Sequence, residues 1–226
     1  MSLTDLQTEI ACCRRCPRLV AWREEVAELK RASFRDEEYW GRPVPAFGDA
    51  EPRILVVGLA PAAHGANRTG RMFTGDRSGD WLYGALHRAG FANQPESTHR
   101  GDGLELRDVW VSAAVRCAPP ANRPTPAERD ACRPWLEAEL DLIEDLRVIV
   151  CLGQFSWNQT LRILKDRGGG VPRPRPAFGH GAEVDLGGGL TLLGSYHPSQ
   201  QNTFTRRLTR KMFDSVWTRA RELTQG

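Results

Sequence analysis

Four short apolar runs constrain the fold of this chain more than any other feature. They span residues 53–58, 109–115, 147–152 and 190–196. Near-continuous apolar runs that alternate with helical patterns are typical of a parallel sheet that is buried on both faces. We therefore predict an α/β protein, with a central four-stranded, mainly parallel sheet in a three-layer α/β/α arrangement that forms one domain over residues 1–226.

Apolar residues at helical spacing, with charges between them, predict an amphipathic helix over residues 17–32. Similar patterns predict further helices over residues 80–87, 127–146 and 205–223, and one after residue 152. The Gly- and Pro-rich segments 168–181 and 187–189 predict turns or a hairpin.

Three distinctive loops each follow a predicted strand. They are residues 59–76, 116–123 and 197–202. In parallel α/β folds, ligands bind at the carboxyl ends of the strands. We therefore predict that the three loops meet at that edge of the sheet and form the functional site there.

Four of the six cysteines have a spacing that fits a metal centre better than disulfides. Cys13 and Cys16 form a tight Cys-x-x-Cys pair, whereas fourteen residues separate Cys117 from Cys132. One tight pair and one loose pair favour an iron–sulfur cluster over zinc, because structural zinc sites usually repeat the tight spacing. Zinc and reduced structural thiols are the alternatives that the residues leave open.

The other two cysteines have simpler interpretations. Cys12 is predicted to be a spare thiol, and Cys151 lies in an apolar run and is predicted to be a core residue. The N-terminus has no apolar segment of the kind that directs secretion, and no run of about eighteen apolar residues occurs. We therefore expect a cytoplasmic protein, in which thiols stay reduced.

Charge gives only a weak indication of the partner. The chain has 31 Lys and Arg against 28 Asp and Glu, a formal net charge of +3, which is a small excess for a polyanion-binding protein. Arginines nevertheless cluster in and beside the first two loops and after the third, where Lys211 joins them. These clusters indicate a nucleic-acid contact, and an ordinary solvated charged face is the alternative interpretation.

The loop after the first strand is rich in glycine and small residues, which let backbone N–H groups approach a ligand closely. It lacks the Gly-Lys-Ser/Thr ending of a phosphate-binding P-loop. Phe73 lies in this loop between Gly70 and Gly75, where its ring could stack on a planar base. A loop-anchoring role in the core is the alternative for Phe73.

Four motifs, in order, resemble those of the family 5 (type B) uracil-DNA glycosylases, iron–sulfur members of the uracil-DNA glycosylase superfamily. They are Gly58-Leu-Ala-Pro-Ala-Ala-His64, Gly70-Arg-Met-Phe-Thr-Gly-Asp76, Arg116-Cys-Ala-Pro-Pro-Ala-Asn-Arg123 and Ser195-Tyr-His-Pro-Ser199. The resemblance runs from Cys13 to about Arg210. It implies a 4Fe-4S cluster held by Cys13, Cys16, Cys117 and Cys132, and an enzyme that flips a damaged base out of DNA and releases it by hydrolysis, leaving an abasic site.

The resemblance also implies roles for individual residues. His197 would hydrogen-bond a carbonyl of the base as negative charge develops there. Related enzymes carry an Asp, Asn or Glu in the first motif, which here offers no carboxylate or amide, so Asp76 and Asn122 become the candidates for holding or activating water. Asp76 precedes a helical pattern, and helix capping is its alternative role. Ala60, Pro61 and Phe73 would contact the base together with His197.

A second departure concerns specificity. Ala113 stands where the related family 4 enzymes carry an Asn that reads the uracil edge. The loss of that donor and acceptor predicts a tolerant site that accepts uracil and also hypoxanthine, xanthine and other altered bases. Gln200, Gln201 and Asn202 follow the His-Pro-Ser motif, and either fill the gap left by the flipped base or form an ordinary loop.

The predicted partner is DNA that contains deaminated or damaged bases, and the predicted DNA contacts are Arg71, Arg116, Arg123, Gln201 and Arg206. No membrane or obligate protein partner is implied, and we expect a monomer. Two rival functions belong to other classes. One is an iron–sulfur electron carrier or redox sensor, and the other is a DNA-binding module of this ancestry without catalysis.

Overall fold

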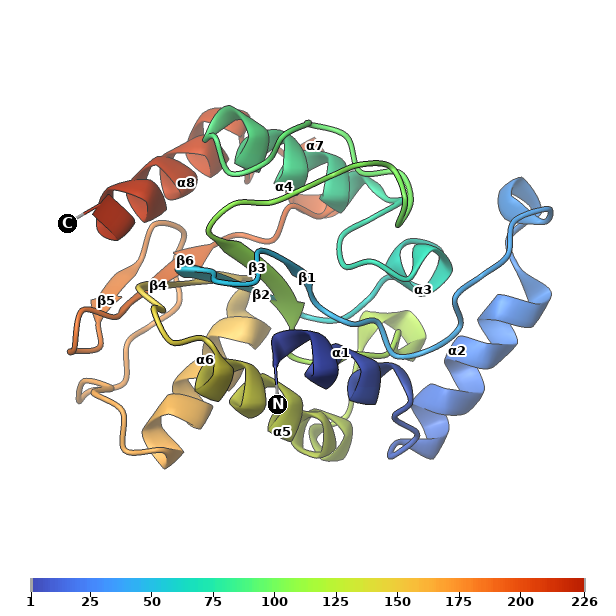
Figure 1. Cartoon of the computed structure of the whole chain (residues 1–226), viewed down its shortest axis with the longest axis horizontal. Helices are drawn as coiled ribbons and strands as arrows, with labels where there is room; N and C mark the ends of the chain where they lie inside the picture. The colour runs from blue at the N-terminus through green and yellow to red at the C-terminus, as the bar shows by residue number, and fades with distance from the viewer. Residues whose placement is uncertain (1, 226) are drawn as a thin grey trace.

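The structure, a computed structural model, describes residues 2–225 and contains one mixed sheet with the strand order β1-β3-β2-β4-β6-β5 (Figure 1). The four inner strands pair in parallel and match the four apolar runs of the sequence. They are β2 (Ile54–Gly58), β3 (Val109–Ala113), β4 (Val148–Leu152) and β6 (Thr191–Ser195). The predicted α/β class and the parallel core of the sheet are confirmed.

The prediction of four strands was wrong at both edges of the sheet. β1 (Phe47–Gly48) pairs antiparallel with β3, and β5 (Glu183–Asp185) pairs antiparallel with β6. β1 has only two residues, and β5 exposes two acidic side chains around one buried valine. Neither strand has an apolar run to mark it, because an edge strand needs little burial and charged residues protect its free side.

Helices cover both faces of the sheet and complete three layers (Figure 1). α4 (Arg77–Arg88) and α8 (Arg210–Gln225) pack on one face, and α1 (Leu3–Ala11), α5 (Pro126–Leu142) and α6 (Gln154–Asp166) pack on the other. Residues along each inner strand alternate between the two cores, as a pleated strand requires. In β2, Ile54 and Val56 join the first core, and Leu55 and Val57 join the second.

Capping residues set the start of the helices that matter for the site. Asp76 caps α4, and Thr125 with Glu128 forms a capping box at the start of α5. α2 (Pro17–Leu29) begins directly after Cys16, with Pro17 in the first turn. The short helices are η1 (Ala32–Phe34), α3 (Ala66–Thr69), η2 (Pro120–Asn122) and α7 (Gln200–Phe204).

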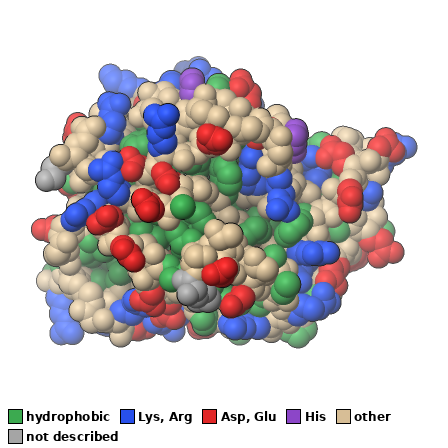
Figure 2. All heavy atoms as spheres, viewed as in Figure 1, with side chains coloured by type: hydrophobic (Ala, Val, Ile, Leu, Met, Phe, Trp, Pro, Cys, Tyr) green, Lys and Arg blue, Asp and Glu red, His purple; other side chains and the backbone are tan. Residues whose placement is uncertain are grey.

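The surface in this view carries no large region of one charge. Figure 2 shows Lys and Arg side chains interspersed with Asp and Glu, in keeping with the small net charge. With a formal net charge of only +3, attraction for a polyanion depends on where cationic side chains gather locally. Among residues 2–225, no helix combines the length and apolar composition that crossing a bilayer requires.

Candidate active site

A cavity of about 360 Å³ opens at the carboxyl edge of the sheet, where the three distinctive loops meet. We call it the edge cavity. Its size is suitable for a small planar ligand. One part of its wall is apolar and includes Leu59, Ala60, Pro61, Met72 and Phe73. The polar side chains that line it are Asp76, Ser78, Asn122, His197, Ser199 and Gln201.

The fold thus brings together seven of the residues selected from the sequence, namely Ala60, Pro61, Phe73, Asp76, Asn122, Gln201 and His197. They come from three loops far apart in the chain. Parallel strands make this possible, because the loops that follow β2, β3 and β6 all leave the sheet at the same edge.

Phe73 is held in an unusual backbone conformation that points its ring into the edge cavity. Its φ is +51°, in the left-handed region that favours glycine. A Cβ at Gly58 would lie 2.8 Å from the Phe73 ring, and a Cβ at Gly79 would lie 1.8 Å from the Phe73 carbonyl oxygen. Glycine is therefore needed at both positions, one beneath the ring and one against the backbone.

Arg71 fixes the same loop from inside the protein. It is 4% exposed, and its guanidinium donates to Asp102, Ser97 and Thr74 at 2.6 to 3.0 Å. The expectation that Arg71 contacts DNA is therefore corrected. Its charge is engaged by the buried carboxylate of Asp102, so its effect is to hold the Phe73 loop against residues 97–102.

Asp76 combines a structural contact with a free carboxylate oxygen. Oδ1 accepts hydrogen bonds from the backbone N–H groups of Ser78 and Gly79 at 2.8 and 3.1 Å, which caps α4. Oδ2 lies beside Gly65, where an added Cβ would be only 2.3 Å away. Burial raises the pKa of Asp76, although the two backbone hydrogen bonds act to lower it. Capping and a second role are thus compatible, because each uses a different oxygen.

His197 faces Phe73 across the edge cavity. The centroids of the two rings are 5.8 Å apart and the ring planes are inclined by 31°. Burial lowers the pKa of His197 to about 4, so the imidazole is neutral at neutral pH. The Asn202 side chain donates to the His197 carbonyl oxygen at 2.8 Å and fixes the loop. A neutral imidazole in this position can donate one hydrogen bond to a ligand without adding a charge.

Asn122 and Gln201 are exposed residues that line the edge cavity. Arg123, next to Asn122 in the chain, and Arg206, just after α7, are exposed as well. Asn122 has a φ of +55° and Arg206 a φ of +58°. Sequence reasoning missed Phe204, which is 63% exposed at the end of α7, with the Arg77 guanidinium 4.4 Å from its ring centroid. The signal available in the sequence was an aromatic residue that follows a polar run.

Arg116 does not reach the surface, which corrects the expectation that it contacts DNA. It is 1% exposed and forms an ion pair with Glu139, which is fully buried. Glu139 also accepts hydrogen bonds from Trp110 and Ser112 at 3.1 and 2.7 Å. The pair joins the end of β3 to α5 in the core, so it supports the loop that carries Asn122 and Arg123.

The four cysteines with metal-centre spacing lie together beside α2. Cys13, Cys16, Cys117 and Cys132 line one cavity, which Arg23 and Arg116 also line. We call this set of residues the cysteine site. Burial raises the pKa of Cys117 to about 11 and that of Cys132 to about 12. Cys12 is exposed outside the site, and Cys151 is buried in the sheet.

The arrangement of the thiols bears on which metal they suit. Among residues 2–225, no group of three or more His, Cys, Asp or Glu side chains is placed to hold a single metal ion. A zinc ion draws four sulfurs to about 2.3 Å from one centre. A 4Fe-4S cluster binds each thiolate at a different iron, so its ligands stand further apart. The four cysteines are of the number and type that both kinds of centre use.

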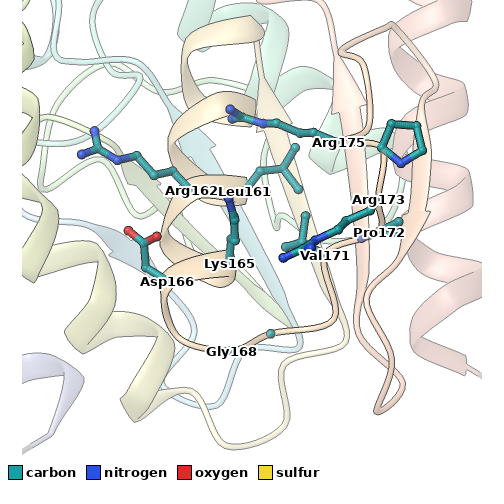
Figure 3. A pocket seen from close by; sticks show the side chains of 11 residues that line it. Leu161, Arg162, Lys165, Asp166, Gly168, Val171, Pro172, Arg173 and Arg175 are labelled. Carbon is teal, nitrogen blue, oxygen red and sulfur yellow. The ribbon is translucent and has the colours of Figure 1, made fainter.

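A second cavity lies between α6 and the segment that follows it (Figure 3). Lys165, Arg173 and Arg175 line it, together with Arg162 and Asp166. α6 runs back from the carboxyl edge of the sheet, so this cavity lies away from the edge cavity. None of the four motifs contributes to it.

Comparison with known proteins identifies the family. A family model described as the uracil DNA glycosylase superfamily matches residues 45–221. A type-5 uracil-DNA glycosylase of Mycobacterium bovis is 57% identical over 223 residues, which cover 98% of this chain and 82% of the relative. The chain belongs to the uracil-DNA glycosylase superfamily and to its type-5 members. The resemblance seen in the sequence motifs is confirmed.

Other relatives agree with this placement. A type-5 uracil-DNA glycosylase of Thermus thermophilus is 55% identical over 214 residues, which cover 95% of this chain and 94% of the relative. A type-4 uracil-DNA glycosylase of Thermotoga maritima is 32% identical over 158 residues, which cover 67% of each chain. The chain is thus more similar to these type-5 enzymes than to this type-4 enzyme.

Proposed function

We propose that this protein is a DNA N-glycosylase that removes uracil from DNA by hydrolysis and leaves an abasic site. One observation carries the proposal beyond family membership. The edge cavity places the free carboxylate oxygen of Asp76 and the neutral imidazole of His197 in one apolar-walled space beside the Phe73 ring. The aromatic ring suits a planar base, and the neutral imidazole suits the negative charge that develops on the base. The carboxylate suits the water molecule that attacks the sugar.

The apolar wall of the edge cavity receives the flipped base. The Phe73 ring stacks on it, and Ala60 and Pro61 cover its edges. As the glycosidic bond lengthens, negative charge builds on the base carbonyl. His197 donates a hydrogen bond to that oxygen, and its low pKa makes it a neutral donor when the base enters. Such a donor stabilises the leaving base most strongly when water is excluded.

Asp76 acts on the sugar side of the bond. Its ionised carboxylate orients a water molecule toward the anomeric carbon, accepts the proton of that water and stabilises the positive charge that develops on the sugar. Oδ1 stays bonded to the α4 backbone, so Oδ2 is the oxygen that does this. Asn122, at the mouth of the cavity, helps to hold the water or a neighbouring phosphate.

We propose that the cavity also accepts hypoxanthine, xanthine and other altered bases. Ala113, at the end of β3, is 1% exposed and offers no side-chain donor or acceptor to a base. The apolar part of the cavity wall, which includes Ala60, Pro61 and Phe73, selects a base by shape and stacking more than by one hydrogen-bonding edge. Selection then depends partly on how easily a mispaired base leaves the helix.

The proposed DNA contacts are the exposed side chains around the cavity mouth. Arg123 and Arg206 are placed to meet phosphates, and Gln201 to fill the space that the base vacates. Phe204, three residues after Gln201 in α7, adds an exposed ring that is suited to stacking on the neighbouring bases.

We further propose that the cysteine site holds a 4Fe-4S cluster, with Cys13, Cys16, Cys117 and Cys132 as ligands. Unpaired N–H groups of Arg23 and Arg116, both of which line the site, support an anionic occupant. The cluster would supply a cross-link, not a reaction step, between the start of α2, the loop after β3 and α5. That cross-link positions the loop that carries Asn122 and Arg123.

The test is base release from end-labelled duplexes that carry one uracil or one hypoxanthine, followed by alkali cleavage at the abasic site. We expect the wild-type protein to cleave at both bases, and Asp76→Ala and His197→Ala to suppress both reactions. Cleavage at uracil alone would reject the proposal of broad specificity and would support the proposal of uracil removal.

Two other outcomes would favour the rival functions. Specific binding to the uracil duplex with no abasic product would reject catalysis and leave a DNA-binding module. No binding to DNA, together with a bound cluster that accepts electrons reversibly, would favour an electron carrier or redox sensor. The edge cavity argues against that rival, because electron transfer needs no cavity beside Phe73 and His197.

A further inference from the structure

Arg23 is a buried charged residue that neither the family motifs nor the proposed reaction explains. It lies in the middle of α2 and is 1% exposed, whereas most charged residues of this helix face solvent. Burial of a guanidinium without a charged partner is unfavourable by several kcal/mol, on the order of the penalties found for single buried ions. A compensating group is therefore expected beside it.

Arg23 bridges both halves of the cysteine site. Its Nη1 donates to the Cys117 Sγ at 2.9 Å and to the Cys13 carbonyl oxygen at 3.3 Å, and its Nη2 donates to the same carbonyl at 3.2 Å. One side chain thus touches the tight cysteine pair and the loose pair, which are far apart in the sequence. A hydrogen bond to sulfur is strong when the sulfur is ionised.

Carboxylates near the cysteine site do not balance this charge. The Glu24 carboxylate lies 3.8 Å from Arg23, but it is 44% exposed and also pairs with Arg14. Glu139 is bonded to Arg116, and Glu128 to Arg18. Among the described residues, the buried nitrogens without a hydrogen-bond partner include Nε of Arg23, and Nε and Nη1 of Arg116.

We propose that Arg23 is the counter-charge of the cluster, and that Arg116 directs a second set of N–H groups toward it. This inference rests on the proposed 4Fe-4S cluster. Four thiolates carry more negative charge than the iron–sulfur core cancels, so the ligated site is anionic. The guanidinium of Arg23 balances that charge and fixes the Cys117 sulfur, and the unpaired N–H groups obtain acceptors.

The electrostatic consequence has a definite sign. A positive charge beside the cluster favours its more reduced state, because reduction adds negative charge. Removal of the charge therefore lowers the reduction potential of the cluster and makes its oxidation easier. The loss of one charged hydrogen bond corresponds to about a tenfold change in an equilibrium or a rate.

The test compares Arg23→Gln, Arg23→Lys and the control Arg14→Gln in full-length protein purified without oxygen. Gln keeps an N–H donor but removes the charge, whereas Lys keeps the charge. Arg14 lies next to Cys13 in the sequence, but its side chain is 63% exposed and pairs with Glu24. The readouts are iron per chain, the midpoint potential of the cluster, and the rate at which its visible absorbance fades in air.

We expect Arg23→Gln to lower the midpoint potential and to lose its absorbance about tenfold faster than wild type. Arg23→Lys should lie much closer to wild type, and Arg14→Gln should match it. If Arg23→Gln does not fold, a potential for Arg23→Lys equal to that of wild type supports the charge role. A large drop in potential for Arg23→Lys would overturn it.

Two other results separate this inference from the proposal on which it rests. A wild-type protein that contains no iron after purification without oxygen would reject the cluster and the counter-charge together. A second result would reject the counter-charge and leave the cluster in place. It is a wild-type protein with a full cluster, together with an Arg23→Gln variant whose midpoint potential and fading rate equal those of Arg14→Gln.

Discussion

The edge cavity and the cysteine site are built in opposite ways. The edge cavity is open and formed by loops, and it depends on backbone in rare conformations at Phe73 and Asn122. The cysteine site is closed and formed by side chains of helices and a loop, with a buried cation between them. One region keeps space for a ligand that comes and goes, and the proposed cluster would make the other a permanent cross-link.

The two regions are nevertheless connected through Asn67. This residue is fully buried in α3, and its Nδ2 donates to the Arg23 carbonyl oxygen at 3.2 Å. Its neighbour Ala66 lines the edge cavity. A change at the cysteine site can therefore move the wall of the edge cavity, whereas substitutions at the mouth of the cavity should leave the cysteine site intact. This asymmetry can be tested.

The largest effect is expected for Cys13→Ser. Loss of one ligand should remove most of the bound iron, lower the melting temperature and abolish base release, because the cross-link that supports the Asn122 loop is gone. The neighbouring substitution Cys12→Ser is a matched control, since Cys12 is exposed outside the site. Iron analysis and thermal melting measure the result. Equal iron content in the two variants would contradict the predicted ligand set.

Asp76→Asn should separate capping from catalysis. Asn caps helices as well as Asp does, so the melting temperature should stay close to that of wild type. The carboxylate that activates water is lost, and base release in single-turnover assays should fall by about a hundredfold or more. Iron content should not change. Retention of full activity would show that Asp76 is only a cap.

The pH profile gives a second test of the same residue. Burial raises the pKa of Asp76, so the carboxylate is protonated at low pH, and activity should rise as the pH increases through that raised pKa. Above the pKa of Asp76 the activity should reach a plateau, on which His197, with a pKa of about 4, is neutral. The acid limb should be absent from Asp76→Asn. A limb that persists there would belong to another group.

Gly79→Ala should have a smaller effect, confined to the edge cavity. The new Cβ would overlap the Phe73 carbonyl oxygen, and the loop must shift at a cost of about 1–3 kcal/mol. We expect roughly tenfold weaker base release with unchanged iron content. Gly84→Ala in the same helix is the control, since its Cβ would meet only the flexible Arg88 side chain. Equal losses of base release in both variants would mean that the effect arises from α4 as a whole and not from the Phe73 loop.

The smallest effect is expected for Arg123→Ala. An exposed phosphate contact contributes little alone, so binding to a uracil duplex should weaken a few-fold. The slope of log affinity against log salt should fall by about one. Rates of base release at saturating protein should not change. A large fall in that rate with an unchanged salt slope would instead place Arg123 in the chemistry.

The sequence predicted the parts of this fold that have a strong local signal. The four inner strands were found because they are largely buried on both faces and therefore mostly apolar. β1 and β5 were missed because an edge strand of two or three residues has no such pattern. The start of α4 was predicted too late, because its first turn, Arg77-Ser78-Gly79, is polar.

The residues of the edge cavity were found from motifs, whereas the arginines were harder to place. Arg71 and Arg116 are identical in type to Arg123, and only three-dimensional packing shows that the first two are buried against Asp102 and Glu139. Burial of Arg23 was equally invisible, because α2 is charged on most of its surface. For Arg71 and Arg116, the partner that holds the side chain inside the protein is a carboxylate far away in the sequence. For Arg23 it is a cysteine sulfur and a backbone carbonyl.

The double use of Asp76 has a consequence for motion. The carboxylate is held in place by the Ser78 and Gly79 amides, so opening of the first turn of α4 releases both the helix end and the reacting group. Hydrogen exchange of these two amides thus measures how often the site is dismantled. A fraying helix end, normally without functional meaning, would here set the fraction of molecules that are ready to react.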